Sequence, residues 1–179
     1  ALVDALGRYV DESFENITVF YETAARELIT GDNGEVVGVK GLSAGNKPFE
    51  IIGRNVVLAC GGFQGNPEML SHYIGPQAQY VRPVSRGGHY NRGEGIKMAL
   101  DIGAAPCGDF GSFHAQPVDP RATDIEPVVL NYAYGILINN SGERFTDEGA
   151  AMVDATYEVV TRIIMEQRQG IAYAIFDES

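Results

Sequence analysis

The feature that most constrains the fold is an apolar run at residues 55–59, which leads through Cys60 directly into Gly61 and Gly62. A nearly continuous apolar run of this length is typical of a strand that is covered on both faces. The two glycines let a backbone approach a ligand closely. The alternative is a strand that simply ends in a tight turn, because Gly-Gly turns are ordinary. In either case we expect residues 55–59 to form a strand of the core.

Size and charge narrow the class of protein. A chain of 179 residues, 45% of them hydrophobic, is long enough for one globular domain or two small lobes. Its net charge of −11 would repel a phosphate backbone, so we expect no nucleic-acid partner. Its apolar stretches are far shorter than the roughly 20 residues of a membrane-spanning helix, so we expect no membrane span. Cys60 and Cys107 show no CxxC spacing. This indicates neither a metal site nor a disulfide framework and favours the reducing cytoplasm.

The order of predicted elements mixes helices and strands. Apolar residues at three- and four-residue spacing predict helices at residues 2–14, 67–73, 93–103 and 153–164. Asn66 is the expected N-cap of the second helix, and Gly103 is expected to close the third. Runs of β-branched and aromatic residues predict strands at residues 17–23, 26–30, 35–41, 49–52, 55–59, 134–138, 143–146 and 171–177. The prediction is an α+β fold.

Two turns and one irregular segment organise these elements. Gly- and Asn-rich turns at residues 31–34 and 139–142 predict two hairpins, each between the strands that flank it. Residues 104–127 contain several prolines and little periodicity, which is typical of a crossing between lobes. We therefore place a domain boundary near Pro106, with domains at residues 1–106 and 107–179.

Short motifs follow the Gly-Gly turn in a fixed order. ACGG at residues 59–62 is followed by NRGEG at 91–95, HAQP at 114–117 and GERFTDEG at 142–149. Together these motifs resemble the fumarate reductase and succinate dehydrogenase flavoprotein superfamily, and within it the FAD-dependent tricarballylate dehydrogenases. The resemblance covers nearly the whole chain. It implies part of an FAD-binding domain joined to part of a capping domain, so we expect the chain to be an internal piece of a longer flavoprotein.

The resemblance implies FAD as the cofactor and assigns it contacts. The residues it places against FAD are Ala24, Ala25, Cys60, Gly61, Gly62, Arg92, Gly93 and Glu94. The first two would pair with the adenine through their backbone. Cys60 replaces a threonine hydroxyl of the family, and we expect its side chain to be packed. Arg92 also replaces a threonine; it would bring positive charge toward the flavin or a substrate carboxylate, and the alternative is a solvated surface arginine.

The resemblance also implies a substrate site in the capping domain. The family's Gln-Ala-His-Pro motif appears here with its polar residues exchanged, as His114 and Gln116. Two residues apart on an extended chain, both side chains point to the same face. His114 is thus a candidate for binding a substrate carboxylate, with Gln116 beside it, and we expect His114 at the entrance between the lobes. The alternative is a structural histidine.

Three positions depart from the fumarate reductases. Met152 stands where that family has a proton-donating arginine, and Val128 and Asn131 stand where it has the glutamate and arginine of its proton relay. Because methionine cannot donate a proton, fumarate reduction is disfavoured. Tyr132 and Tyr134 are phenols that could substitute, as tyrosines do in the related ketosteroid dehydrogenases, or they could belong to the core.

The resemblance therefore implies an FAD-dependent oxidoreductase that acts on CH–CH groups of a small polycarboxylate such as tricarballylate. An electron-acceptor protein is a candidate partner. The alternatives are a steroid-type flavin dehydrogenase, which would show an apolar cap pocket, and a non-catalytic ligand-binding or interaction module. The sequence identifies no catalytic base. Arg144 and Glu148 are expected to form an internal ion pair rather than to act on substrate.

Overall fold

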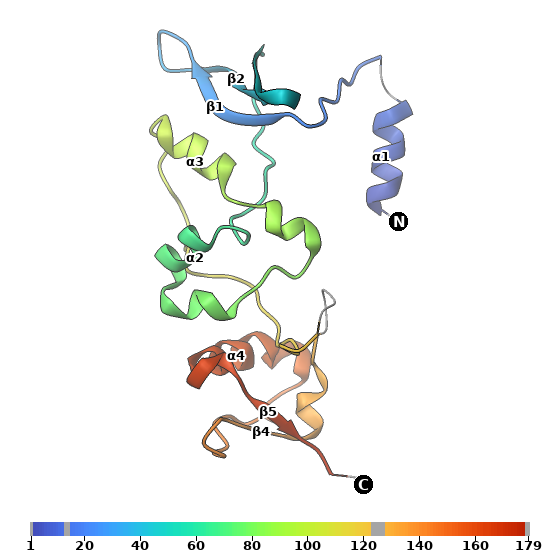
Figure 1. The fold of residues 1–179 in the computed structure, drawn as a ribbon, viewed down its shortest axis with the longest axis vertical. Helices are drawn as coiled ribbons and strands as arrows, with labels where there is room; N and C mark the ends of the chain where they lie inside the picture. Colours follow the sequence, from blue (N-terminus) through green and yellow to red (C-terminus); the bar gives the residue numbers. More distant parts are fainter. Residues whose placement is uncertain (1, 13–14, 123–127, 178–179) are drawn as a thin grey trace. The chain divides into compact units, whose positions relative to one another are not determined.

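The computed structural model describes residues 2–12, 15–122 and 128–177 (Figure 1). By its internal contacts the chain divides into two compact units. The first unit comprises residues 1–58 with 98–104, and the second comprises residues 59–97 with 105–179. Helices and short antiparallel strands occur in both units. The predicted α+β fold is confirmed.

The first unit is built on a three-stranded antiparallel sheet. Its strands are β1 (Ala24–Thr30), β2 (Val36–Ser43) and β3 (Lys47–Ile52), in the order β1-β2-β3. The predicted hairpin is confirmed, because Gly34 at φ +83° closes the turn by donating its N–H to the Gly31 carbonyl over 3.0 Å. The predicted first helix is also confirmed, as α1 (Leu2–Glu12).

The strand expected at residues 17–23 is wrong. No strand covers these residues in the described chain, and β1 begins at Ala24. A turn at residues 21–23 interrupts the extended backbone. Glu22 adopts φ +51°, and the Thr23 hydroxyl donates to the Tyr21 carbonyl over 2.9 Å. β-Branched and aromatic residues raise strand propensity, but a positive φ at a non-glycine residue breaks the extended run.

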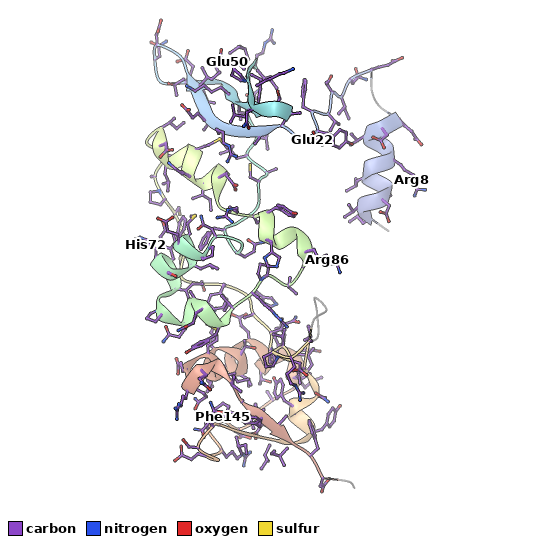
Figure 2. The ribbon with its side chains drawn as sticks, viewed as in Figure 1. Arg8, Glu22, Glu50, His72, Arg86 and Phe145 are labelled. Carbon is purple, nitrogen blue, oxygen red and sulfur yellow. The ribbon has the colours of Figure 1, made fainter. Side chains whose placement is uncertain are left out.

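The second unit contains α2 (Pro67–Ile74), the start of α3 (Glu94–Asp101), and α4 (Val153–Glu166). All three correspond to predicted helices. Its strands β4 (Ile136–Ile138) and β5 (Tyr173–Ile175) pair antiparallel. The core cluster of this unit consists of Tyr132, Leu137 and Val160, with partly buried side chains around it that include Phe145, labelled in Figure 2.

The second predicted hairpin is only half right. The turn forms as expected, with the Gly142 N–H donating to the Asn139 carbonyl over 3.0 Å. However, residues 143–146 form no strand and contribute a single bridge, from Arg144 to Ile138. The carboxylate of Glu148 accepts the N–H of Leu137, a group that a strand at 143–146 would otherwise use. The strand partner of β4 is therefore β5.

The core strand expected at residues 55–59 is also wrong. Residues 55–60 lie outside every strand of the described chain, and Val57 is 86% exposed. An apolar run becomes a buried strand only where neighbouring strands and a covering layer exist. In the described residues no strand pairs with this run, and only Val56 in it is half-buried. A separate point concerns membranes: within the same residues, no helix has the length and apolar character needed to cross one.

Candidate functional site

The Gly-Gly turn and the segment before α3 lie against each other within the second unit. The Gly93 N–H donates to the Gly62 carbonyl over 3.1 Å, and the Gly65 N–H donates to the Asn91 carbonyl over 2.8 Å. These contacts join two segments that are about thirty residues apart in the sequence. We call residues 59–62 and 91–94 together the paired-loop site. It contains six of the eight residues predicted to contact FAD.

Glycine is required at two positions of the paired-loop site. Gly61 and Gly93 adopt φ values of +73° and +81°, a region that side chains rarely occupy. Space is also restricted. A Cβ at Gly61 would lie 2.9 Å from the Asn91 side chain, and one at Gly93 would overlap the Met69 sulfur and lie 3.1 Å from Phe63 Cβ. At both positions the positive φ itself disfavours a side chain, and at Gly93 the Phe63 Cβ restricts the space as well.

Asn66 ties the paired-loop site to α2. Its Oδ1 accepts the N–H groups of Glu68 and Met69, which confirms the predicted N-cap. Its Nδ2 also donates to the Arg92 carbonyl over 2.8 Å. The sequence signalled only the first role, because a cap is recognised from neighbours along the chain. The contact with Arg92 spans 26 positions and has no local signal.

The polar side chains of the second loop take different directions. The Glu94 carboxylate folds back and accepts the Arg92 backbone N–H over 3.2 Å. The Arg92 side chain is exposed. Glu94 therefore stabilises the loop itself, and the Arg92 guanidinium is accessible to an anion in solvent.

Cys60 is exposed, so the expectation of a packed side chain is wrong. It lies at the end of the same run that forms no strand: of residues 55–60 only Val56 is half-buried, and the others are exposed. Cys107 is likewise free and exposed. The first loop of the paired-loop site consequently presents its backbone and a thiol to any ligand that approaches it.

Ala24 and Ala25 belong to the first unit, at the start of β1. They pair with Leu42 and Gly41, and the register shifts immediately after Ala25. A Cβ at Gly41 would overlap the Ala24 carbonyl, so this glycine permits the close approach of the two strands. Because β1 is an edge strand, part of its backbone points away from β2. Such an edge can hydrogen bond a flat polar group.

His114 is held by α4 at both ring nitrogens. Its Nε2 lies 2.9 Å from the Tyr157 hydroxyl, and its Nδ1 lies 3.2 Å from Glu158 Oε2. The His114 and Tyr157 rings meet edge to face, with centroids 5.3 Å apart. The His114 side chain is 63% exposed and lies outside the core cluster. Gln116, two residues further on, is half-buried.

Arg162 of α4 holds the segment next to His114 against the helix. Its guanidinium bonds Glu158 over 3.0 Å, donates to the Phe113 carbonyl and lies 4.6 Å from the centre of the Phe113 ring. The hydrogen bond from Arg162 and the contact with His114 lower the pKa of the Glu158 carboxyl, against a smaller opposing effect of burial. Glu158 is therefore ionised at neutral pH, which favours an Nδ1–H on His114.

The remaining sequence candidates fall in different surroundings. Arg144 and Glu148 form the expected ion pair at 2.6 Å, with Glu148 only 2% exposed. Tyr132 is 1% exposed and belongs to the core, whereas Tyr134 is 87% exposed. Met152, which the resemblance places opposite the reductases' arginine, is 78% exposed. Among the residues that the structure describes, no group of three His, Cys, Asp or Glu could hold a metal ion.

A model of the FAD binding domain matches residues 1–177. The chain belongs to the FAD binding domain family. Within it, the resemblance to the fumarate reductase and succinate dehydrogenase flavoprotein superfamily is confirmed. The paired-loop site fits the cofactor of the FAD binding domain, because its exposed part, residues 59–61, presents backbone and small side chains close to the start of α3.

Proteins of known activity resemble this FAD binding domain over part of their length. The urocanate reductase of Eggerthella lenta is 30% identical over 93% of the chain, which covers 27% of that protein. The NADH:fumarate oxidoreductase of Klebsiella pneumoniae is 28% identical over 99% of the chain, which covers 18% of that protein. The chain thus spans about a quarter or less of these relatives.

A solved structure shows the same fold. The 3-ketosteroid-delta4-(5alpha)-dehydrogenase from Rhodococcus jostii RHA1, crystallised with 4-androstene-3,17-dione, matches 91% of the chain with a TM-score of 0.66 and 26% identity. The chain covers 30% of that protein.

Proposed function

We propose that the chain is part of an FAD-dependent oxidoreductase that acts on a CH–CH bond beside a carboxylate group. The observation that carries this proposal is the hydrogen bond from Gly93 to Gly62. It joins two of the four motifs on which the superfamily resemblance rests, and Gly61 is exposed beside this contact. At this contact Gly93 adopts φ +81°, a conformation that glycine permits.

The proposal assigns the cofactor to eight residues: Ala24, Ala25, Cys60, Gly61, Gly62, Arg92, Gly93 and Glu94. The edge of β1 would pair with the adenine, and the paired-loop site would line the cleft of the flavin. When bound, FAD would accept or supply the hydride of the reaction. The contribution of this chain is to hold the cofactor through backbone groups and to place the positive charge of Arg92 near it.

The substrate that we propose is a small polycarboxylate such as tricarballylate. The names of the two relatives support a carboxylate, since both urocanate and fumarate carry one. The side chains at Val128, Asn131 and Met152 lack the proton-donating groups of fumarate reductases, which favours oxidation over fumarate reduction. His114 and Gln116 lie in the segment that we assign to the substrate.

A steroid substrate is the second candidate, because the ketosteroid dehydrogenase has this fold. A steroid would require an apolar pocket near the assigned segment. The groups around His114 are instead ionic or strongly polar, namely Glu158, Arg162 and the Tyr157 hydroxyl. This environment favours a charged substrate over a steroid.

The proposal extends to domains, partner and location. Residues 1–106 would belong to the FAD-binding domain and residues 107–179 to the cap. A separate electron-acceptor protein would reoxidise the flavin. The free thiols of Cys60 and Cys107 support a cytoplasmic location, because unpaired thiols persist in reducing compartments.

An anaerobic titration of the intact, flavin-loaded protein tests the substrate. Tricarballylate should bleach the flavin absorbance more completely than succinate does, because the positions of the succinate-type proton relay carry no proton donor here. Preference for succinate would overturn the tricarballylate assignment and leave only the coarser carboxylate assignment.

A further inference from the structure

Three side chains outside the paired-loop site form a continuous hydrogen-bonded line. The Tyr157 hydroxyl meets His114 Nε2 at 2.9 Å, and His114 Nδ1 meets Glu158 Oε2 at 3.2 Å. The ring of Tyr157 packs against the core cluster, whereas the His114 ring is 63% exposed. A carboxylate, an imidazole and a hydroxyl in this order can pass a proton along the line.

We propose that Tyr157, His114 and Glu158 form a proton-transfer unit, in which Tyr157 exchanges a proton with the substrate carbon. This inference rests on the proposed function, and it supplies the acid–base group that the sequence left unidentified. Both ring nitrogens of His114 are occupied by α4 side chains. His114 therefore acts through Tyr157 as a positioning residue and as the proton acceptor behind it, and not as a direct ligand of the substrate carboxylate.

The proposed step balances. In oxidation, the C–H bond next to the carboxylate breaks and its proton forms an O–H bond on Tyr157. At the same time the proton of Tyr157 moves to His114 Nε2. The electron pair of the broken C–H bond becomes the second bond of the new alkene, as the adjacent carbon releases hydride to the flavin. In reduction the same proton movements run backwards.

The charge of Glu158 explains why the line favours this movement. With an Nδ1–H directed at Glu158, His114 Nε2 is the acceptor of the Tyr157 hydroxyl, so the proton rests on Tyr157 until the substrate proton arrives. The imidazolium that then forms lies beside the Glu158 carboxylate. Arg162 fixes that carboxylate in place through its bonds to Glu158 and Phe113. The unit thus receives its orientation from α4 and from residues 113–114.

The first test is Tyr157→Phe in the intact, flavin-loaded protein. This change removes the hydroxyl and retains the ring that packs against the core. We expect kcat/KM to fall about 100-fold or more, as for the loss of a general acid or base, with unchanged flavin content and melting temperature. Tyr173→Phe, at a half-exposed tyrosine of β5, is the matched control and should retain full activity. Equal activity of the two variants would overturn the proposal.

The second test is Glu158→Gln, read as separate values of kcat and KM. The titratable and charged groups that face His114 are Tyr157 and Glu158, with Arg162 behind Glu158. The carboxylate of Glu158 stabilises the imidazolium that forms only during the step, so kcat for oxidation should fall while KM stays nearly unchanged. Glu166→Gln, at an exposed glutamate of α4, is the matched control and should change neither value. An unchanged kcat in Glu158→Gln, or a change in KM alone, would contradict the proton-transfer unit.

These tests separate the unit from the proposed function. The variants are compared on whichever of tricarballylate, succinate, fumarate, urocanate and 4-androstene-3,17-dione the unaltered protein converts. If only the steroid reacts, the carboxylate assignment fails, and the Tyr157→Phe comparison still tests the proton-transfer role of Tyr157. If both tyrosine variants convert a carboxylate equally well, the proton-transfer proposal fails and the proposed function stands.

Discussion

The side chain of Asn66 donates from Nδ2 to the carbonyl of Arg92 over 2.8 Å. The same side chain caps α2 through Oδ1. One residue therefore fixes both the start of a helix and the loop that precedes α3. Asn66 is not among the residues assigned to FAD. A movement of its side chain would nevertheless displace the Arg92 backbone and so change the paired-loop site.

Replacement of Asn66 should separate these two roles. Asn66→Ala removes both and is expected to cost about 1–3 kcal/mol of unfolding free energy. Asn66→Asp keeps an acceptor for the helix cap and loses the donor to Arg92, so it should cost less in stability. Both variants should weaken FAD binding. Denaturant unfolding and flavin titration measure the two effects. Unchanged flavin affinity in both variants would contradict a role of the Asn66–Arg92 hydrogen bond in FAD binding.

Gly93 should tolerate alanine less well than another positive-φ glycine does. Gly93→Ala combines φ strain with an overlap against the Met69 sulfur and a close contact of 3.1 Å with Phe63 Cβ, whereas Gly103 at φ +89° has open space around its Cβ position. We expect a loss of about 2–3 kcal/mol for Gly93→Ala and about 1 kcal/mol for Gly103→Ala. Thermal unfolding of both variants provides the comparison. Equal losses would mean that the close approach of the loops is unimportant.

The thiols offer a test of the cofactor position that requires no activity. Cys60 and Cys107 are both exposed, and only Cys60 lies in the paired-loop site. In the intact protein, alkylation of Cys60 should slow at least about tenfold when FAD is bound, because the cofactor covers it. The rate at Cys107, read by peptide mass spectrometry, is the internal control. Protection of neither thiol would place FAD elsewhere.

The Glu148 ion pair should make stability depend on pH. Burial opposes ionisation of Glu148, but hydrogen bonds from Arg144 and from the Leu137 backbone outweigh it and lower the pKa. A lowered pKa in the folded state means that the stabilisation is complete above the ordinary carboxyl pKa and is lost as pH falls through the lowered value. Glu148→Gln should cost about 1–3 kcal/mol at pH 7. The difference from the unaltered protein should shrink toward pH 3.

The exposed Asp147 provides the control for that experiment. Its carboxylate lies 3.8 Å from Arg144 and is 72% exposed, so solvent screens it. Asp147→Asn should therefore change the unfolding free energy by less than about 0.5 kcal/mol at pH 7. If both substitutions had the same effect, burial of Glu148 would not be the cause of its contribution.

Local signals in the sequence predicted most elements. The four helices, the first hairpin and the Asn66 cap all depend on spacing or on residues within a few positions of each other. The apolar run at 55–59 was predicted wrongly, because burial of a strand is set by distant neighbours and not by the run itself. The partner of β4 was also missed, since the contact between Leu137 and Glu148 has no local signature.

In the candidate site, too, local features were predicted and long-range contacts were not. The glycines at 61–62 and 93 were recognised from their motifs, and the structure brings them together. The partners of His114 were not foreseen, because Tyr157 and Glu158 lie 43 and 44 positions away. In the sequence, Tyr157 and Glu158 are ordinary residues of a predicted amphipathic helix. Only the tertiary packing of residues 113–114 on that helix reveals the hydrogen-bonded line.

The most direct test of the central claim is anaerobic stopped-flow reduction of the flavin in the intact protein, with small carboxylates and 4-androstene-3,17-dione as alternative reductants. The account predicts that a carboxylate, tricarballylate first among them, bleaches the flavin absorbance in a saturable reaction and that the steroid does not. Reduction by the steroid alone, or a purified protein that binds no FAD under saturating conditions, would contradict it.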